Sequence, residues 1–229
     1  MKRGDIVNEK ELVGIEAAKY VEEGMVVGLG TGSTAHHLIV ELGRRVREEG
    51  LHFVGVATSV QSAELAKEVG INIQSFNDVK QIDLTIDGTD EFDPELNGIK
   101  GGGGAHLIEK IIAVNSNRVI WICDHSKEVA QLGAFPLPVE VIRDASQHLY
   151  DSFEVKGYAP SYRLTPAGDK FITDNGNYLI DLHLEKIINA SQLAEELIHL
   201  VGVVEHGLFL NVADHVIMAK ADKIVHFYK

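Results

Sequence analysis

Four consecutive glycines give the strongest indication of chemistry in this sequence. Lys100 precedes the run Gly101–Gly104, and residues 105–113, with Glu109 among them, have a helical pattern. Glycine loses more conformational freedom on folding than any other residue, so the run is costly unless its backbone has a task. The usual task is to bring amide N–H groups close to an anionic ligand or a developing oxyanion. A carboxylate such as Glu109, one or two turns into the following helix, would lie near that ligand and is a candidate general base.

A second group of candidates follows the apolar residues 25–29. The segment Gly28-Leu-Gly-Thr-Gly-Ser-Thr34 can cradle a phosphate with its amides and with the hydroxyls of Thr31, Ser33 and Thr34. It is not a dinucleotide fingerprint, because Ser33 stands where G-x-G-x-x-G needs glycine and no acidic residue ends the next strand. No Gly-Lys-Ser/Thr follows, so a P-loop is excluded as well.

Carboxylates gather after the predicted strand 82–86. Asp87 and Asp90 stand on either side of Gly88-Thr89, so both side chains can point into a crevice at the end of the strand. Such carboxylates can bind sugar hydroxyls and move protons between oxygens, and a magnesium site is the competing use. We expect the neighbouring Glu91 and Asp93 to belong to a solvated turn. Haloacid dehalogenase phosphatases share Asp-Gly-Thr after a strand, but their nucleophilic aspartate would fall on Thr85, which excludes their chemistry.

The charge and composition narrow the functional class. The formal net charge of −13 argues against nucleic-acid binding and means that an anionic substrate needs local cations, for which Lys100 and Lys127 are candidates. Cys123 is the single cysteine, which excludes an internal disulfide and suits a reducing cytoplasm. The histidines show no spacing typical of metal ligands, and no apolar segment reaches membrane-spanning length. We therefore expect a cytoplasmic protein without a membrane partner.

The elements that must position these residues alternate between short apolar strands and helices. Strands are predicted at 25–29, 53–57, 71–73, 82–86 and 119–123, and helices at 8–21, 35–48, 60–69 and about 105–115. This order predicts an α/β fold with a mainly parallel, Rossmann-like sheet flanked by helices. Ligands bind at the carboxyl ends of the strands in such sheets, which is where each polar or glycine-rich segment lies.

The pattern changes after residue 131. Strand, helix, strand, strand, helix and strand follow at 139–142, 145–153, 161–164, 178–184, 191–200 and 203–204. This β-α-β-β-α-β order is typical of a small ferredoxin-like α+β domain. We expect this domain at 132–205, inserted near the C-terminus of a catalytic α/β domain formed by 1–131 plus 206–229, which would end in short strands at 207–212 and 216–219.

Taken together, the motifs resemble the ribose-5-phosphate isomerase A family. The resemblance covers nearly the whole chain in order, through Gly28–Ala35, Thr58-Ser59, Asp87–Asp90, Lys100–Gly103, Glu109-Lys-Ile-Ile112, Asp124–Lys127, Thr173–Asn177 and Gly202–Phe209. It implies interconversion of D-ribose 5-phosphate and D-ribulose 5-phosphate in the non-oxidative pentose phosphate pathway. It also implies that no metal or organic cofactor is needed and that the chain forms a homodimer or a homotetramer.

The resemblance also assigns roles to residues. It implies substrate binding by Thr31, Gly32, Ser33, Thr34, Asp87, Gly88, Thr89, Asp90, Lys100, Gly101, Gly102, Gly103 and Lys127, with Glu109 as the catalytic base and Asp87, Asp90 and Lys100 as further catalytic residues. Lys10 matches a lysine often found near this site, and a surface position is its alternative. Gly104, His106 and Ile108 depart from the family pattern, which affects the expected rate more than the reaction.

The mechanism predicted from these residues passes through an enediolate. Asp87 or Asp90 assists opening of the sugar ring, and Glu109 moves the C2 proton to C1. Lys100, Lys127 or loop amides stabilise the enediolate. Two alternatives stay open: a sensor that binds sugar phosphates without turnover, and an amino-sugar-phosphate isomerase-deaminase.

Overall fold

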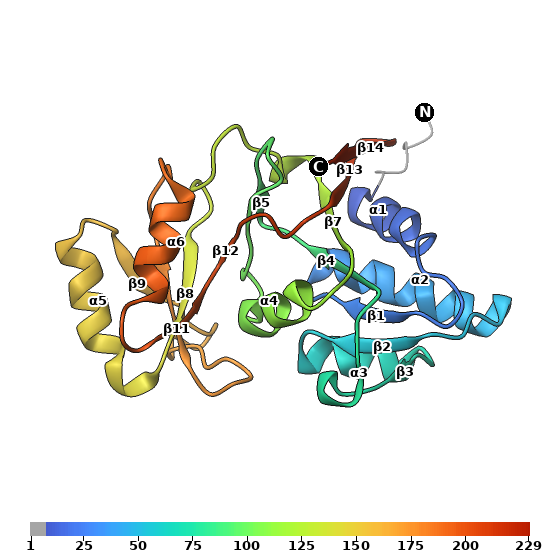
Figure 1. The fold of residues 1–229 in the computed structure, drawn as a ribbon. Coiled ribbons are helices and arrows are strands. Elements are labelled where there is room, and N and C mark those ends of the chain that lie inside the picture. Colours follow the sequence, from blue (N-terminus) through green and yellow to red (C-terminus); the bar gives the residue numbers. More distant parts are fainter. Residues whose placement is uncertain (1–7) are drawn as a thin grey trace. The chain divides into compact units, whose positions relative to one another are not determined.

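The computed structural model describes residues 8–229, and Figure 1 shows their course. The chain divides into two compact units. The first unit comprises the residues up to Gly88, Ile112–Lys127 and Ala213–Lys229, and the second comprises Thr89–Ile111 and Glu128–Val212. The boundary falls within helix α4 (His106–Val114), so its residues belong partly to each unit.

A seven-stranded sheet forms the centre of the first unit, in the order β14-β13-β7-β4-β1-β2-β3. Neighbouring strands run parallel except for the β13–β14 pair. The strands are β1 (Val26–Leu29), β2 (Val54–Ala57), β3 (Asn72–Ile73), β4 (Leu84–Gly88), β7 (Val119–Asp124), β13 (His215–Lys220) and β14 (Lys223–Tyr228). Their mostly buried apolar side chains account for the continuous hydrophobic runs in the sequence.

Three helices pack on this sheet, and local signals set their ends. Helix α1 (Glu9–Ala18) is capped by Asn8, and α3 (Val60–Glu68) by Ser59, since each cap side chain accepts a backbone N–H. Helix α2 (Ser33–Glu49) ends at Gly50, whose φ of 71° is the left-handed conformation that glycine tolerates. Helix α1 packs against α2, β7 and β13, and α3 packs against β2 and β3. The short helices η1 (Phe76–Asp78) and η2 (His125–Lys127) complete this unit.

The second unit contains a four-stranded antiparallel sheet in the order β11-β8-β10-β9. Its strands are β8 (Leu137–Val141), β9 (Pro160–Tyr162), β10 (Tyr178–Leu182) and β11 (Val203–His206), and its helices are η3 (Arg143–Ala145), α5 (Ser146–Val155) and α6 (Ala190–Ile198). The first strand in the chain pairs with the third and fourth, as the predicted ferredoxin-like order requires. Strands β5 (Glu91–Phe92), β6 (Gly98–Ile99) and β12 (Leu208–Phe209) form a separate three-stranded sheet in this unit.

Alternation along β8 separates the two faces of the four-stranded sheet. Leu137, Val139 and Val141 join the apolar core with Leu149 and Phe153 of α5. Pro138 and Glu140 therefore point to the opposite face, because successive side chains of a strand alternate. That opposite face contacts the glycine run, as described below.

The α/β fold class with a mainly parallel sheet is confirmed. Strand β14 and the three-stranded sheet were not predicted. The units also differ from the expected domains, because residues 89–111, 128–131 and 206–212 cluster with the second unit. The physical reason for the first and last of these segments is the three-stranded sheet: β12 pairs with β6, and β6 with β5, so the two segments share one sheet.

Candidate active site

Asp87 ends β4 and is held by the loop that follows β1. One carboxylate oxygen, Oδ1, accepts the N–H of Thr31 at 3.0 Å and the N–H of Gly88 at 2.7 Å. Gly30 passes so close that a Cβ there would lie 2.0 Å from the same oxygen. The absence of a side chain at Gly30 is thus what allows the loop and the buried carboxylate to meet.

A cluster of hydroxyls supports the same loop from within the first unit. Thr31 Oγ1 lies 2.7 Å from Thr58 Oγ1 and donates to Ser59 Oγ at 2.8 Å. Ser62 Oγ donates to the Gly30 carbonyl at 2.7 Å. The Thr31 hydroxyl is therefore used inside the protein, and its backbone is the part of the residue on the Asp87 side. Sequence reasoning did not identify Ser62, because only the fold brings its hydroxyl to Gly30.

The N-terminus of α2 carries the remaining loop residues. Gly32 occupies the N-cap position and supplies no capping side chain, while Ser33 and Thr34 begin the helix. Lys10 on α1 donates from Nζ to Ser33 Oγ at 2.9 Å. The position of Lys10, which the sequence left open, is therefore beside the loop. Helix N-terminal amides and a lysine together make a favourable environment for a phosphate.

Asp124 and Lys127 follow β7 in the same unit. Burial disfavours the charged form of Asp124, but hydrogen bonds from Ser126 and the positive charges of Lys127 and Lys10 together outweigh it and lower the pKa of this carboxyl. Both lysines thus act on one carboxylate. Lys127 is half-buried.

The second unit holds a buried ion pair between two predicted catalytic residues. Lys100 Nζ lies 3.2 Å from Glu109 Oε2, and each side chain is only 4% exposed. The backbone N–H of Lys100 donates to Gly207 O at 2.9 Å, which ties the start of the glycine run to the segment before β12. Glu109 lies in the first turn of α4. The structure thus brings together the lysine and the carboxylate that the sequence selected separately.

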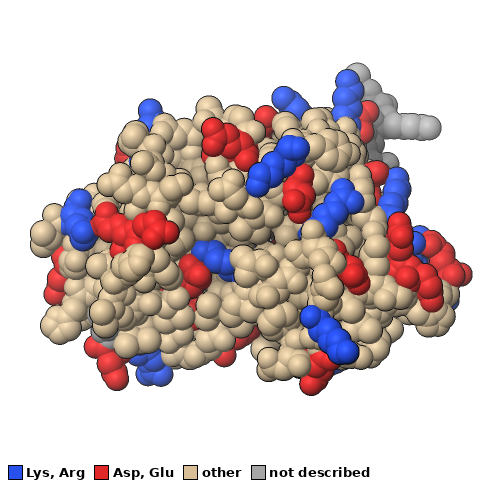
Figure 2. All heavy atoms as spheres, viewed as in Figure 1, with Lys and Arg blue, Asp and Glu red and all other residues tan. Residues whose placement is uncertain are grey.

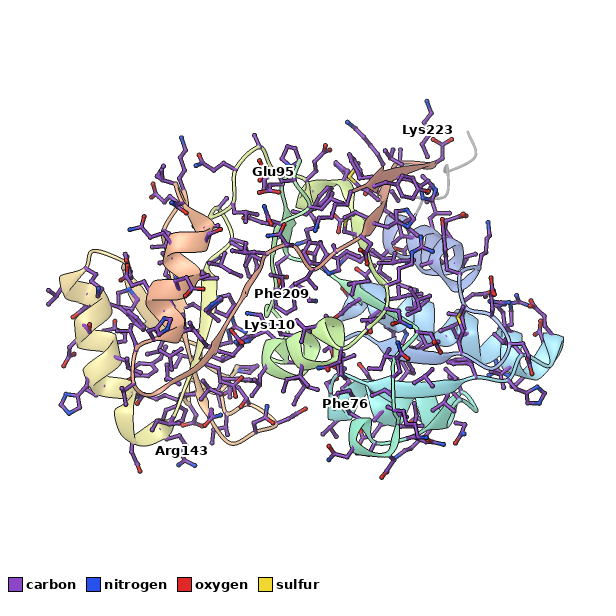
Figure 3. The ribbon with its side chains drawn as sticks, in the orientation of Figure 1. Phe76, Glu95, Lys110, Arg143, Phe209 and Lys223 are labelled. Atoms are coloured by element: carbon purple, nitrogen blue, oxygen red, sulfur yellow. The ribbon has the colours of Figure 1, made fainter. Side chains whose placement is uncertain are left out.

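Phe209 lies near Lys100 and near a second lysine. Figure 3 labels Phe209 and Lys110, whose Nζ lies 4.9 Å from the ring centroid, and Lys100 Nζ lies 5.5 Å from the same centroid. Lys110 Nζ also donates to Glu205 Oε1 and to the His206 carbonyl, both at 2.7 Å. Burial is the main cause that lowers the pKa of Lys110. The motif around Glu205 and Phe209 therefore places one aromatic ring beside Lys100 and Lys110, and pairs Lys110 with Glu205.

The glycine run binds Asp90. The N–H of Gly102 donates to Asp90 Oδ2 at 2.7 Å, and a Cβ on Gly102 would lie 2.6 Å from Asp90 Oδ1. Gly101 and Gly104 have φ values of 113° and 79°, which L side chains rarely adopt. Thr89 turns its hydroxyl to the Glu91 and Ile99 carbonyls at 2.7 and 3.2 Å. The run therefore needs glycine both for its backbone geometry and for its close approach to Asp90.

Two residues beside the run have structural roles. His106 is fully buried against Gly101, and burial lowers its pKa to about 3, so the ring is neutral at physiological pH. Glu91 corrects an expectation: it is buried, and its carboxylate accepts the N–H of Gly133 at 2.8 Å and of Phe135 at 2.5 Å. Asp93 does accept the turn amides of Glu95 and Asn97, both at 2.9 Å.

One group in residues 8–229 has the side chains for a metal ion: Glu9, Asp124 and His125, whose ligand atoms lie within 4.8 Å of one another. Glu9 Oε2 lies 2.7 Å from His125 Nδ1, and Glu9 Oε1 accepts the N–H of Ala221 at 2.7 Å. These hydrogen bonds already use the carboxylate to join α1 to the ends of β7 and β13. We therefore assign the group to the structure of the first unit.

Comparison with known proteins decides the family. The family model for ribose 5-phosphate isomerase A (phosphoriboisomerase A) matches residues 54–223. The chain belongs to the ribose 5-phosphate isomerase A family. Ribose-5-phosphate isomerase A of Streptococcus agalactiae serotype III (strain NEM316) is 58% identical over 92% of this chain and 94% of its own. The enzyme of that name from Enterococcus faecalis (strain ATCC 700802 / V583) is 56% identical over 94% of this chain and 96% of its own.

Solved structures of the family have the same fold. Ribose 5-phosphate isomerase A from Methanocaldococcus jannaschii is 39% identical and aligns with a TM-score of 0.91 over 96% of this chain and 98% of its own. A D-ribose-5-phosphate isomerase in complex with phospho-erythronic acid is 37% identical, with a TM-score of 0.93 over the same shares.

The surface charge and the helix lengths of the described residues add to this description. On the face drawn in Figure 2, acidic and basic side chains are interspersed over the described residues, without an extended basic surface. In residues 8–229, no helix combines the length and apolar character that crossing a membrane requires.

Proposed function

We propose that this chain interconverts D-ribose 5-phosphate and D-ribulose 5-phosphate in the non-oxidative pentose phosphate pathway, with Glu109 as the general base. The observation that carries the proposal is the buried pair of Glu109 and Lys100 at 3.2 Å, in a chain of this family. Aldose–ketose isomerisation needs a base for a carbon-bound proton and a cation for the oxygen that becomes negative. These two side chains supply both.

The proton transfer is the central step. Glu109 removes the proton from C2 of the open-chain aldose and returns it to C1, through an enediolate. Lys100 faces the enediolate oxygens, because it is the cation next to Glu109 within the second unit. Preorganised donors of this kind contribute about 3 to 4 kcal/mol to transition-state stabilisation. Amides of Gly101 and Gly103 assist at the same oxygens or at neighbouring hydroxyls, while the Gly102 amide holds Asp90.

The phosphate is bound by the first unit. Lys10, Ser33 and Thr34 lie at the N-terminus of α2, and Lys127 acts with Lys10 on Asp124. The Gly32 amide extends this group, while the Thr31 amide holds Asp87. Positive potential at a helix N-terminus stabilises a dianion there.

Ring opening is assigned to the two aspartates. Asp87 and Asp90 each keep one oxygen on backbone N–H groups, which fixes their orientation. A second oxygen on either carboxylate can then exchange a proton with a sugar hydroxyl, and Gly88 and Thr89 join the two residues. The ligand of the solved relative, phospho-erythronic acid, is itself a phosphorylated sugar acid, which supports the substrate class.

The proposal includes three further properties: the chain acts as a homodimer or homotetramer, works in the cytoplasm, and requires no metal or organic cofactor. Proton transfer by Glu109 and stabilisation by Lys100 need no further group.

Product analysis tests the function. The purified protein is incubated with ribose 5-phosphate or glucosamine 6-phosphate, each with and without EDTA. Formation of ribulose 5-phosphate at an EDTA-independent rate is expected, with no ammonia from glucosamine 6-phosphate. Ammonia release would favour the isomerase-deaminase, and binding without turnover would favour a sensor.

A further inference from the structure

Arg163 connects the glycine run to Asp181 of the four-stranded sheet, on the face opposite its apolar core. Its Nη1 donates to the Gly101 carbonyl at 2.5 Å and to the Gly102 carbonyl at 3.2 Å. The rest of the guanidinium is bound by Asp181 on β10, with Nε donating to Oδ2 at 3.0 Å and Nη2 donating to Oδ1. The Arg163 and Asp181 side chains are only 16% and 14% exposed, so the contact is protected from water.

The geometry of a peptide bond gives this contact a consequence for the opposite side of the run. A trans peptide is planar, so the carbonyl of one residue and the N–H of the next point in opposite directions. Because Arg163 holds the Gly101 carbonyl, the Gly102 N–H points away from the guanidinium, where it meets Asp90 Oδ2 at 2.7 Å. By the same reasoning, the bond to the Gly102 carbonyl directs the Gly103 N–H away from Arg163.

Glycine peptides need such a restraint more than others do. Glycine adopts positive and negative φ about equally well, so peptide planes within a run of four can turn over at little cost. A single guanidinium with two acceptors fixes two successive planes at once, which a point charge such as the ammonium of lysine does less well.

The same sheet face supports the run on either side of Arg163. A Cβ at Gly101 would lie 3.0 Å from Pro138 Cγ, and one at Gly104 would lie 2.7 Å from Phe171. Phe171 lies in the connection between β9 and β10, and Glu140 on β8 holds the end of that connection through bonds from Thr173 and Asn177, both at 2.9 Å.

We propose that Arg163, held by Asp181, is a positioning residue that keeps the Gly102 amide on Asp90 and aims the Gly103 amide at the sugar and its developing oxyanion. This role rests on the proposed function, since it deepens the part assigned to the glycine run. Arg163 acts through the loop and not by contact with the substrate.

Chemical rescue tests the proposal. In Arg163→Ala, kcat/KM for ribose 5-phosphate should fall about 100-fold, the lower end of the effect of losing one oxyanion donor. Guanidinium chloride at low millimolar concentration should raise kcat/KM of Arg163→Ala at least tenfold, and ammonium chloride should leave it unchanged. The kcat/KM of Arg163→Lys should lie between those of the wild type and Arg163→Ala. Asp181→Asn should lose less kcat/KM than Arg163→Ala does.

Arg143→Ala is the matched control, because Arg143 is an exposed arginine of the same unit that lies over the Tyr178 ring, 5.3 Å from its centroid. It should keep kcat/KM within twofold and show no rescue. A folded Arg163→Ala variant with near-normal kcat/KM, or with a loss that guanidinium leaves unchanged, would overturn the proposal. If Arg163→Ala does not fold, Arg163→Lys and Asp181→Asn decide: near-normal activity in both overturns the role.

Hydrogen exchange separates this proposal from the proposed function. The Gly102 amide should exchange at least tenfold faster in Arg163→Ala than in the wild type or Arg143→Ala. If the Gly102 amide exchanges faster in Arg163→Ala but the wild type has no isomerase activity, the proposed function is wrong and the positioning of the loop by Arg163 is supported. If the wild type is an active isomerase but the Gly102 amide exchanges at the same rate in Arg163→Ala, only the positioning role is wrong.

Discussion

The ammonium of Lys100 lies 3.2 Å from the carboxylate of Glu109, and both side chains are almost fully removed from solvent. Burying two charges costs several kcal/mol per ion, which their attraction offsets only with good geometry. A pair of this kind adds little net stability, yet the loss of either partner leaves an uncompensated charge. The same two residues are the ones to which the proposed reaction assigns the base and the oxyanion cation.

Replacement of the proposed base should remove turnover and leave binding. In Glu109→Gln, kcat should fall about 1,000-fold, within the range for general acid–base groups, while KM changes little. Steady-state kinetics with ribose 5-phosphate measure both. Glu95→Gln, at an exposed carboxylate of the second unit, is the control and should match the wild type. Near-normal turnover in a folded Glu109→Gln protein would show that another group is the base.

Replacement of the buried lysine should lower the stability of the protein. Lys100→Met should lower the free energy of unfolding by about 3 kcal/mol, since it leaves Glu109 buried without its cation. The double variant Lys100→Met/Glu109→Gln should regain part of that loss. Urea titration measures each value.

Lys19→Met provides the control for that experiment, because the Lys19–Glu16 pair has a 2.6 Å contact but a lysine that is 65% exposed. Its loss should cost less than about 1 kcal/mol. Equal costs at Lys100 and Lys19 would contradict the view that burial makes the Lys100 pair sensitive.

A methyl group at Gly30 should disturb the loop that holds Asp87. The added Cβ would lie 2.0 Å from Asp87 Oδ1, so the carboxylate or the loop must shift. Gly30→Ala should therefore lower kcat/KM at least tenfold and the free energy of unfolding by about 1 to 3 kcal/mol, as overpacking does. In unfolding experiments Gly88→Ala is the comparison, since its nearest atom would be 3.7 Å away, and its stability should be nearly unchanged. A Gly30→Ala protein with full activity would show that the position of Asp87 is not critical.

Stability should fall in mild acid, partly through His215. Burial, aided by the nearby His226 and Arg118, lowers the pKa of His215 to about 4, from an ordinary value of 6.5. The unfolded chain then binds the proton more readily, so this contribution to stability is complete above pH 6.5 and is lost as the pH falls toward 4.

His215→Phe keeps an aromatic ring beside Tyr228, which stacks on His215 with 4.3 Å between ring centroids. The slope of unfolding free energy against pH gives the number of protons that the chain takes up on unfolding. Between pH 4.5 and 6, we expect this number to be smaller by about one in His215→Phe. His52→Phe, at an exposed histidine, should leave the slope unchanged. An unchanged slope in His215→Phe would contradict the assignment.

The sequence by itself determined the fold class and most of the candidate residues. Apolar strands alternating with helical periods predict the parallel sheet, and the turn signals after residue 131 predict the ferredoxin-like order, because both depend on local spacing. The glycine run, the Asp87–Asp90 pair and Glu109 were identified by type and spacing as well. The family comparison and the sheet orders confirm the family and the fold.

The tertiary structure decided how distant residues pair. Strands β5 and β6 have two residues each, too few for a periodic signal, and their sheet draws residues 89–111 and 206–212 into the second unit. Lys10 reaches Ser33, and Arg163 reaches Gly101 across 62 positions of the chain. Glu91 is buried on two amides that lie more than 40 residues away. Local patterns state whether a residue prefers water or a core, but a hydrogen-bond partner far along the chain is set only when the elements pack.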